Sequence, residues 1–373
     1  MGPSTGGDGG VTLSTRPDHS RNELREGGAA SRITGIDVAR ALAIIGMMMV
    51  HVGPTAAEGP TGRLYALPHG RASLLFVLVA GVGVTLLGRS RTTGRGRFRL
   101  TLLWRAALLL PLGLALQVLD HGAAVILQTY ALLFVVAMVA RELTDRWLLN
   151  AAGIAAVTGP GIFLWGTLRA PEVYDRSPVT WGDPAGELVH GLLLSGPYPV
   201  VVWTAPLLLG MWLGRRDLTS HAFAVRLLVA GSITAIASAA VSSVAEMGLA
   251  GPDAPEWVQL ATSVTPHSQM PLWLLNGTGV AVAVLGAALL WTGKAGRAAR
   301  PVVAAGQLAL TIYVGHLVVL HLYPDRATAT TVGAAGWRVV VASLVMLAFA
   351  QLWRSRFPRG PLETLLRLPS RTP

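Results

Sequence analysis

The 373-residue sequence contains no cysteine and few charged side chains. Without cysteine, the chain has no disulfide, no thiolate metal site and no cysteine nucleophile. Only 13% of its residues are charged and 52% are hydrophobic, whereas about a quarter of a typical soluble domain is charged. Water is therefore not expected to be its main solvent. Apolar segments recur from residue 33 to 354 without a polar block large enough to fold alone, so we predict one membrane domain.

Lysine is nearly absent as well, because Lys294 is the only lysine among 30 basic residues. The formal net charge of +11 therefore comes from arginine. The arginines form short clusters between apolar segments, without the interleaved aromatic residues typical of a nucleic-acid-binding surface. We predict no nucleic-acid partner and interpret the clusters as a signal of membrane orientation.

The apolar segments have the length that a membrane-spanning helix needs, about 17 to 25 residues. The sequence predicts an all-α, polytopic integral membrane protein with about ten transmembrane helices. A further apolar segment, Glu187 to Ser195, is short and is followed by Gly196, Pro197 and Pro199. It is interpreted either as an interfacial helix or as part of a broken sixth span. The predicted spans are 33–53, 72–88, 102–119, 123–140, 147–168, 198–214, 223–248, 269–293, 302–323 and 333–353.

Alternate loops between these spans differ in arginine content, and arginine-rich loops face the cytoplasm. The opposite loops carry only scattered basic residues such as Arg63, Arg169, Arg176 and Arg326. We therefore predict that both termini are cytoplasmic in a multi-pass protein of the cell's inner (plasma) membrane. The arginine-rich side holds Arg16, Arg21, Arg25 and Arg32; Arg89, Arg91, Arg95, Arg97 and Arg99; Arg141 and Arg146; Arg215 and Arg216; Lys294, Arg297 and Arg300; and Arg354, Arg356 and Arg359.

Three regions follow from this pattern. Residues 1–32 are rich in Gly, Ser and Arg and poor in large apolar side chains, which predicts a disordered cytoplasmic tail. Residues 33–355 are predicted to form the transmembrane domain, and residues 356–373 a cytoplasmic C-terminal tail.

The first span carries three ionisable residues, Asp37, Arg40 and His51. Placing such side chains in hydrocarbon costs free energy, so each is expected to have a charged partner, to line a cavity or to serve a function. Arg40 and His51 are eleven residues apart, close to three turns, which puts them on one helix face about 16 Å apart along the axis. A simpler alternative is that Asp37 and Arg40 neutralise each other as an i, i+3 ion pair.

Seven of the nine histidines fall at the predicted outer side: His51, His69, His121, His190, His267, His316 and His321. Other hydrogen-bonding groups accompany them in the outer half, namely Gln128, Trp203, Asn276, Thr311 and Tyr313. Together these residues predict a polar cavity open to the exterior.

Simpler interpretations apply to several of these residues. His121, His190 and His321 are interpreted as amphipathic anchors at the membrane–water interface. Asn276 and Thr278 lie beside Gly277 and Gly279, a pattern that also suits close helix packing. Arg105, near the start of the third span, is expected to snorkel toward the headgroups.

Several stretches resemble the transmembrane acyltransferase superfamily, which includes heparan-α-glucosaminide N-acetyltransferase, its bacterial relatives and bacterial sugar O-acyltransferases. The resemblance rests first on RITGIDVARALAIIGMMMVHVG from Arg32 and LPHGRASLLFVLVAGVG from Leu67. It extends to GPYPVVVWTAPLLLGMWLGRRD from Gly196, TPHSQMPLWLLNGTGVAVAVLG from Thr265 and GQLALTIYVGHLVV from Gly306. These stretches match in pattern rather than in near identity.

The resemblance implies two alternatives for a catalytic histidine. The O-acyltransferases carry an Arg, ten residues and a His in their first span, which Arg40 and His51 match. The heparan-type enzymes place their active-site His before the second span, where this sequence has His69. The chain departs from the pattern at Ala41, where relatives usually have Gly, and it lacks the large soluble domain of some members.

The implied reaction is transfer of an acyl group, expected to be acetyl, from cytoplasmic acetyl-CoA to a hydroxyl or amine of a sugar or other acceptor at the outer face. Arg40, Asp37 and Arg105 are the predicted donor-binding residues, and the phosphates are expected to contact Arg40, Arg105 or the arginine-rich loop at residues 89–99. His51 or His69 is the predicted base or acyl carrier. No metal is predicted. Donors to the acceptor or to the developing oxyanion are expected among Asn276, Tyr313, His316, Trp203 and His267.

A different function class fits the same pattern. A small-molecule transporter or flippase without catalysis would also have many spans, an outward polar cavity and broken helices. No inverted repeat is evident between the two halves of the sequence, and the intramembrane charge is concentrated in one helix, which favours the enzyme. Membrane lipids are expected partners in either case, and small-residue helix faces leave a homodimer open.

Overall fold

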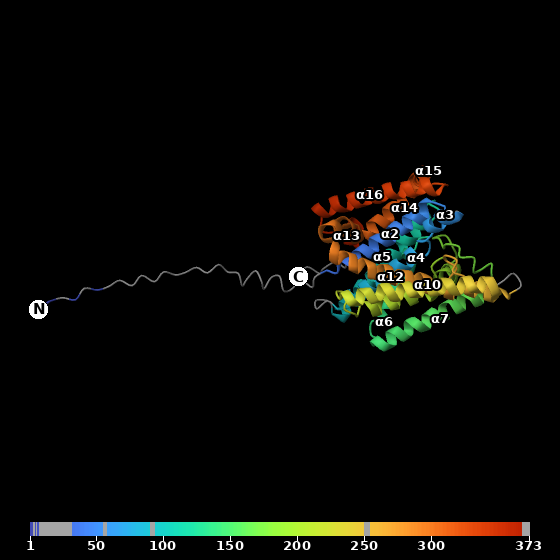
Figure 1. Cartoon of the computed structure of the whole chain (residues 1–373), viewed down its shortest axis with the longest axis horizontal. Coiled ribbons are helices and arrows are strands. Elements are labelled where there is room, and N and C mark those ends of the chain that lie inside the picture. Colours follow the sequence, from blue (N-terminus) through green and yellow to red (C-terminus); the bar gives the residue numbers. More distant parts are fainter. Residues whose placement is uncertain are drawn as a thin grey trace. The chain divides into compact units, whose positions relative to one another are not determined.

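The computed structural model describes residues 1, 2, 4, 6, 32–54, 58–89, 94–249 and 254–367. Within these residues every regular element is a helix. The chain divides into two units, Met1–Arg32 and Ile33–Pro373, and the helices labelled in Figure 1 belong to the second. The tail predicted over residues 1–32 lies almost wholly outside the described residues.

Seven helices in the described part of the chain are long and apolar enough to cross a membrane. This recurrence of apolar helices makes the chain a multi-pass membrane protein. The helix beginning at His221 continues through η2 (Ala245–Leu249), and the one beginning at Pro271 continues through η3 (Gly296–Ala299) and α13 (Arg300–Gln307). The seven are α2 (Thr34–Val52), α4 (Arg71–Arg89), α5 (Arg95–Gln117), α7 (Asp145–Arg169), α10 (His221–Val244), α12 (Pro271–Ala295) and α16 (Val332–Arg356).

The remaining predicted spans coincide with shorter or broken helices. The pair Ala185–Ser195 and α9 (Val200–Leu213) is bent by 48° and gives an eighth span if it is counted as one. The first half of this pair consists of α8 (Ala185–His190) and η1 (Gly191–Ser195). α6 (Leu127–Ala140) and α14 (Ala309–Leu322) have 14 residues each, or about 21 Å, which is shorter than a hydrocarbon core of about 30 Å. The total of ten spans and the cytoplasmic placement of both termini stay predictions.

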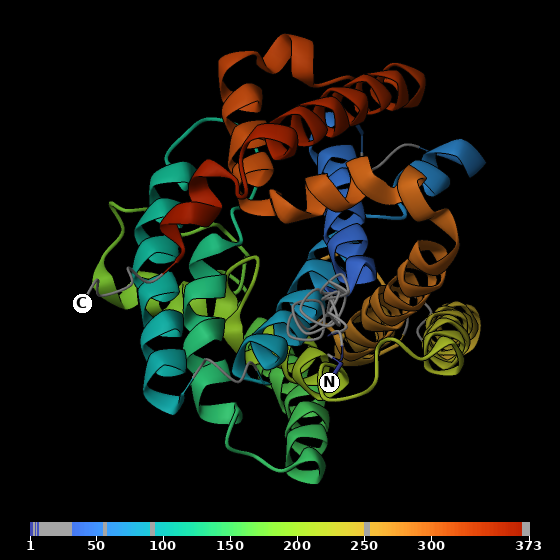
Figure 2. The same ribbon diagram turned by 90° about the vertical axis from the view of Figure 1, so that its left-hand side faces the viewer.

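Helix α2 lies in the interior of the helical unit, in contact with α4, α12, α13, α14 and α16 (Figure 2). Small residues allow these close contacts. A Cβ atom at Gly35 would approach the backbone of Leu289 in α12 to 2.8 Å, and one at Gly46 would lie 2.9 Å from the Cβ of Ala72. The segment that carries Asp37, Arg40 and His51 is thus held against neighbouring helices rather than exposed to lipid along its whole length.

Helices α10 and α12 pack through glycine in the same way. A Cβ atom at Gly279 would lie 2.8 Å from the amide nitrogen of Ala235, and one at Gly231 would lie 2.4 Å from that of Ala283. Gly277 faces α4, where a Cβ atom would lie 2.3 Å from Leu74 Cδ1. The close-packing interpretation of Gly277 and Gly279 is therefore correct.

Short helices complete the unit: α3 (Gly59–Tyr65), α11 (Glu256–Thr262), α15 (Pro324–Ala327) and α17 (Pro361–Leu365). The last lies in the predicted C-terminal tail, yet it contacts the start of α14. One carboxylate oxygen of Glu363 accepts from the amides of Leu310 and Thr311 at 2.8 and 3.0 Å. A carboxylate at a helix N-terminus satisfies amides that lack intrahelical partners and complements the helix dipole.

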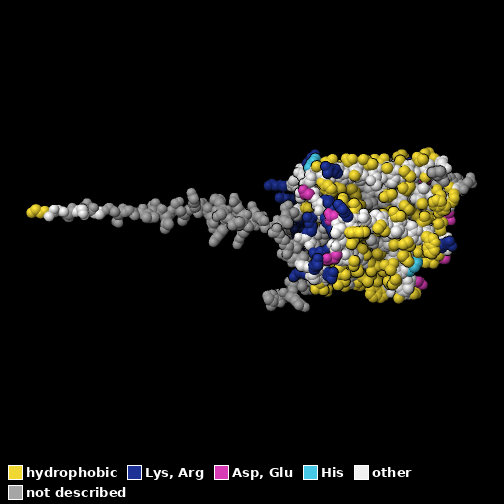
Figure 3. All heavy atoms as spheres, turned by 90° about the horizontal axis from the view of Figure 1, so that it is seen from below, with side chains coloured by type: hydrophobic (Ala, Val, Ile, Leu, Met, Phe, Trp, Pro, Cys, Tyr) yellow, Lys and Arg dark blue, Asp and Glu magenta, His cyan; other side chains and the backbone are white. Residues whose placement is uncertain are grey.

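Charge is separated from apolar surface along the helical unit. In Figure 3 most visible Lys and Arg side chains gather at one end, and hydrophobic side chains cover the flank. Val157 of α7, Ile233 of α10 and Leu344 of α16 are more than half exposed. An apolar flank with a basic end is the surface expected of a protein whose arginine-rich loops lie at one face of a bilayer.

Candidate functional site

His51 and His316 form a hydrogen-bonded pair between α2 and α14. Nδ1 of His51 lies 3.1 Å from Nε2 of His316, and the two rings are nearly parallel, with centroids 5.3 Å apart. One ring nitrogen donates and the other accepts, according to the tautomer. If His51 donates from Nδ1, its Nε2 keeps a lone pair and can act as a base.

Aromatic rings extend from this pair toward Arg40. Tyr313 lies edge-on to His316 at 5.2 Å between centroids, Phe76 follows at 6.5 Å from Tyr313, and Tyr130 lies 5.4 Å from Phe76. The hydroxyl of Tyr130 is buried without a hydrogen-bond partner, and Tyr130 is close enough to Arg40 for the charge to act on it. Arg40 and His51 therefore border one aromatic-lined interior region, as their spacing on one helix face predicts.

Arg40 belongs to a polar network at the other end of α2, formed by Asp37, Arg40, Gln307 and Arg354 and called the Arg40 network below. Nη1 of Arg40 donates to Oδ1 of Asp37 at 2.9 Å, and Nε2 of Gln307 lies 3.3 Å from Oδ2. Arg354 donates to Oε1 of Gln307 at 2.7 Å. The side chain of Asp37 is 2% exposed and that of Arg40 25%.

The predicted ion pair between Asp37 and Arg40 therefore exists, but it does not neutralise the region. Arg105 is close enough to Arg40 for the two charges to repel, and its Nε is buried without a partner. Arg354 joins the network through Gln307, so three arginines and one aspartate lie in this region. A positive excess at partly buried arginines is suited to binding an anion such as phosphate.

A second group of polar residues surrounds His69. His69 and His267 lie 5.4 Å apart between ring centroids, and His267 also contacts Trp203 and Trp273. Nε1 of Trp203 donates to Oε1 of Gln269 at 3.0 Å, and Nε2 of Gln269 donates to the carbonyl of Pro197 at 2.8 Å. Gln269 is fully buried. This side-chain arrangement joins the loop before α4, the break before α9 and the loop before α12.

The backbone at this second group is unusual. Outside glycine, the residues with positive φ in the described part of the chain are Arg176, His267 and Gln269. Nη1 of Arg176 donates to the carbonyl of His267 at 3.3 Å, so all three residues lie together. Left-handed conformations at residues other than glycine are uncommon and often occur at functional sites.

Both histidines of this group are held neutral. Burial lowers the pKa of His267 to about 3, with a further contribution from the charge of His69. Burial also lowers the pKa of His69, and the charge of Arg71 adds to that effect. Each imidazole is therefore neutral near neutral pH and can accept a hydrogen bond.

His51 links the two groups, because His316, His121, His267 and His69 all lie within electrostatic range of it. His51, His69, His267 and His316 are called the histidine cluster below. His121 is engaged with backbone: its Nε2 lies 2.9 Å from the carbonyl of Leu116, and its Nδ1 accepts from the amide of Ala123.

The last two predicted outer histidines make other local contacts. His190 lies 2.9 Å from the Ser195 hydroxyl, and His321 lies 3.1 Å from the carbonyl of Asp120. Within the described ranges, no group of three or more His, Asp or Glu residues is placed to hold a metal ion.

The predicted acceptor residues are divided among three places. Tyr313 and His316 lie with His51, Trp203 and His267 lie with His69, and Asn276 lies elsewhere. Asn276 accepts from Nε and Nη2 of Arg71 at 3.0 and 2.7 Å and donates to the carbonyl of Ala235 at 2.8 Å. It joins α4, α10 and α12, and its polar atoms are engaged.

Sequence reasoning missed Arg71, Gln269 and Trp273. Arg71 and Gln269 each follow a candidate histidine by two residues, His69 and His267. That proximity in the PHGR and PHSQ stretches was the available signal. Their roles depend on contacts across 66 to 205 residues of sequence, which a pattern along one chain does not reveal.

Residues 213–370 match the model of a family described as a protein of unknown function (DUF418). The matched region covers less than half of the chain. It contains His267, Asn276 and His316, whereas Arg40, His51 and His69 lie before it. No curated protein matches the chain.

Proposed function

We propose that the protein is a membrane-bound acyltransferase that moves an acetyl group from acetyl-CoA to a hydroxyl or amine of a sugar or related acceptor. The observation that carries the proposal is the hydrogen bond between His51 and His316, because His51 lies on the same helix as Arg40. A base candidate and an anion-binding candidate thus lie on one helix, about 16 Å apart by helix rise. Acyl-CoA is a substrate with phosphates at one end and a thioester at the other.

The Arg40 network fits the phosphate end of such a donor. Arg40 is partly exposed, and the buried Nε of Arg105 has a proton to donate without a protein partner. Charge-assisted hydrogen bonds from arginine to phosphate are short and strong. Asp37 orients Arg40 through their ion pair rather than contacting the donor itself.

His51 is the proposed base at the acyl end. Its neutral imidazole removes the proton of the acceptor hydroxyl or amine as the acceptor atom attacks the thioester carbonyl. The C–S bond then breaks, and the same proton passes to the departing thiolate. The alternative route, in which the imidazole is first acylated and then transfers the group, balances in the same way.

His316 and Tyr313 are proposed to support this step. Nε2 of His316 accepts the hydrogen bond from Nδ1 of His51 and so selects the tautomer of His51 with a free Nε2, as the third member of a catalytic triad does. Tyr313 accepts from the amide of Ile126 at 3.3 Å, which leaves its own proton for an oxyanion or an acceptor oxygen. His69 remains the competing base, since its pKa is lowered and it lies beside Arg71.

The test is an assay of the purified full-length protein with radiolabelled acetyl-CoA and a panel of glucose, glucosamine and N-acetylglucosamine. His51→Ala and His69→Ala are compared with the parent, and His321→Ala serves as an exposed histidine control. We expect His51→Ala to lose transfer and His321→Ala to keep it. Loss in His69→Ala alone would move the base to His69, and full transfer by both variants would contradict the mechanism.

Broken helices favour a second candidate, a transporter or flippase. The 48° bend before α9 and the break at Leu308 between α13 and α14 interrupt two apolar segments, and transporters often use such discontinuous helices at their substrate sites. Acetyl-CoA separates the two functions. A thermal shift with acetyl-CoA supports the enzyme, whereas uptake of a sugar into vesicles without CoA supports the transporter.

A further inference from the structure

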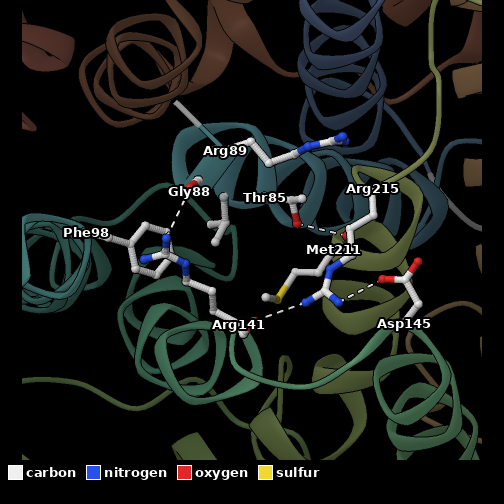
Figure 4. Close-up of a pocket in the computed structure, with 9 residues that line it drawn as sticks. Thr85, Gly88, Arg89, Phe98, Arg141, Asp145, Met211 and Arg215 are labelled. Atoms are coloured by element: carbon white, nitrogen blue, oxygen red, sulfur yellow. Dashed lines mark hydrogen bonds and ion pairs between the residues drawn. The ribbon is translucent and has the colours of Figure 1, made fainter. Parts of the chain in front are cut away.

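A pocket of about 420 Å³ lies among the ends of five helices, α4, α5, α6, α7 and α9 (Figure 4). Its wall contains three arginines, Arg89, Arg141 and Arg215, and one carboxylate, Asp145. Three positive charges and one negative charge leave an excess of two positive charges on the wall. We call these four residues the arginine pocket.

Each guanidinium group in the arginine pocket donates at least one hydrogen bond to a carbonyl at a helix end. Arg89 donates to the carbonyl of Gly214 at 3.1 Å, and Nη2 of Arg141 donates to that of Gly88 at 3.1 Å. Arg215 donates to the carbonyls of Leu143 and Arg141 and to Asp145. Arginine near helix C-termini commonly satisfies such carbonyls, so capping alone explains these contacts.

Helix capping leaves one nitrogen of Arg141 unexplained. Nη1 of Arg141 is buried and has no hydrogen-bond partner. The guanidinium lies over the ring of Phe98, 4.2 Å from its centroid, which fixes its plane at the pocket wall. A buried charged donor without an acceptor is costly, and a turn of the Arg141 side chain toward the pocket would let an anion there accept from it.

Asp145 does not neutralise the pocket. Its two oxygens are taken by Arg215 at 2.9 Å and by Arg216 at 2.5 Å. Glu142, the next residue after Arg141, pairs instead with the exposed Arg95 at 3.4 Å. The hydroxyl of Thr85 in the wall donates to the carbonyl of Met211 at 2.8 Å. Recognition in this pocket therefore depends on guanidinium groups.

The arginine pocket is separate from the Arg40 network. Gly83 of α4 faces Arg40, where a Cβ atom would lie 2.8 Å from Nη2. Thr85 and Gly88 of the same helix face the pocket. At about 100° per residue, Gly83 lies about 200° from Thr85 and about 140° from Gly88, so the two sites use opposite faces of α4.

We propose that the arginine pocket binds the phosphate group of a phosphorylated ligand, with Arg141 as its principal contact. Phosphate carries more charge than a carboxylate and matches the planar donors of arginine. The pocket has room for more than a bare phosphate ion. The ligand chemistry is a phosphate ester or diphosphate, and its source is either a soluble molecule or the headgroup of an anionic lipid at the basic end.

The test measures binding of inorganic pyrophosphate to the full-length protein in neutral detergent at low ionic strength, by isothermal titration calorimetry. Arg141→Gln is compared with Arg146→Gln, a matched change of charge at an exposed arginine beside Asp145. We expect saturable binding by the parent, a loss of affinity of about tenfold or more in Arg141→Gln, and less than a twofold change in Arg146→Gln. Arg89→Gln, at an exposed position, tests the pocket without the risk of unfolding a buried contact and is expected to weaken binding as well.

A second arm identifies the source of the phosphate. The protein is placed in nanodiscs of phosphatidylcholine alone or with phosphatidylglycerol, and pyrophosphate is titrated again. Competition by phosphatidylglycerol that disappears in Arg141→Gln assigns the pocket to lipid phosphate, and undiminished binding assigns it to a soluble ligand. No saturable binding of either probe, or equal weakening by Arg141→Gln and Arg146→Gln, would overturn the proposal. Neither arm depends on acyl transfer.

Discussion

The histidine cluster and the arginine pocket use buried polar side chains in opposite ways. In the histidine cluster, burial lowers the pKa of His69 and His267, and aromatic rings surround the imidazoles. In the arginine pocket, helix-end carbonyls and Asp145 accept hydrogen bonds from the guanidinium groups. The first environment suits the movement of a proton, and the second suits the binding of an anion.

The Arg40 network combines features of both environments, because it has a buried carboxylate and more than one arginine. Its carboxylate is almost fully buried, yet arginines outnumber it. One helix thus passes from a charged environment at Asp37 and Arg40 to a neutral one at His51. This difference along α2 is what the proposed donor requires, with phosphates at one end and a thioester at the other.

The largest effect on acetyl transfer is expected for a substitution of His51, at the neutral end of α2. His51→Gln keeps a polar side chain of similar size but removes the base, so kcat for acetyl transfer is expected to fall by about 10²- to 10⁴-fold. Labelled product formed per enzyme at saturating acetyl-CoA measures this. A loss of less than threefold would show that His51 is not the base.

The second largest effect is expected for a substitution of Arg40, at the charged end of α2. Arg40→Gln removes a phosphate contact, and the KM for acetyl-CoA is expected to rise by about tenfold or more while kcat changes less. The change also leaves buried Asp37 without this ion pair and lowers stability. Asp37→Asn/Arg40→Gln is therefore the matched variant, expected to regain stability but not affinity. Restored affinity in the double variant would assign Arg40 a structural role alone.

A smaller effect is expected in the pH dependence of stability. The folded-state pKa of His267 is lowered to about 3, and that of His69 is lowered too. Unfolded histidine takes up a proton below about pH 6.5, where the folded protein does not. The free energy of unfolding is therefore highest above about pH 6.5, and it decreases as the pH is lowered toward 3. The slope is at most about 1.4 kcal/mol per pH unit for each group.

Thermal midpoints in detergent between pH 7 and 5 measure this slope. His267→Asn removes one titrating group and tolerates the positive φ of 56° at this position. Its midpoint is expected to depend less on pH than that of the parent. An equal slope in both proteins would show that His267 is not held neutral by the fold.

The smallest effect is expected for the exposed ion pairs at the basic end. Glu142 pairs with Arg95 at 3.4 Å and with Arg99 at 4.0 Å, and all three side chains are exposed. Glu142→Gln is therefore expected to change the free energy of unfolding by less than about 1 kcal/mol. A larger change in a urea titration would mean that the surface charges at this end act as a connected network.

Local pattern predicted much of the fold. The lengths of the apolar segments predicted the expected spans, and the structure has a helix or a helix pair at each of them. Helix periodicity predicted that Arg40 and His51 share one face of the first helix. The break at Leu308 within the predicted span 302–323 was not predicted. Two residues earlier, a Cβ atom at Gly306 would collide with the carbonyl of Asp37, a contact between helices that the local pattern does not reveal.

The candidate site was predictable only in part. Histidine placement along the chain predicted that imidazoles gather at one side, and the structure pairs His51 with His316 and His69 with His267. The partner of Asn276 and the burial of Gln269 were not predictable, since both depend on contacts between distant helices and loops. The arginine pocket was hidden for the same reason, because its wall comes from five helix ends.

One measurement tests the central claim directly, namely that the donor and the acceptor enter from opposite ends of α2. The protein is reconstituted into sealed vesicles with glucosamine trapped inside and radiolabelled acetyl-CoA supplied outside. In vesicles whose arginine-rich face points outward, we predict acetylated glucosamine inside for the parent and at most about a hundredth as much for His51→Gln. Acetylation that occurs only when both substrates share one side, or that is equal in both proteins, would contradict the account.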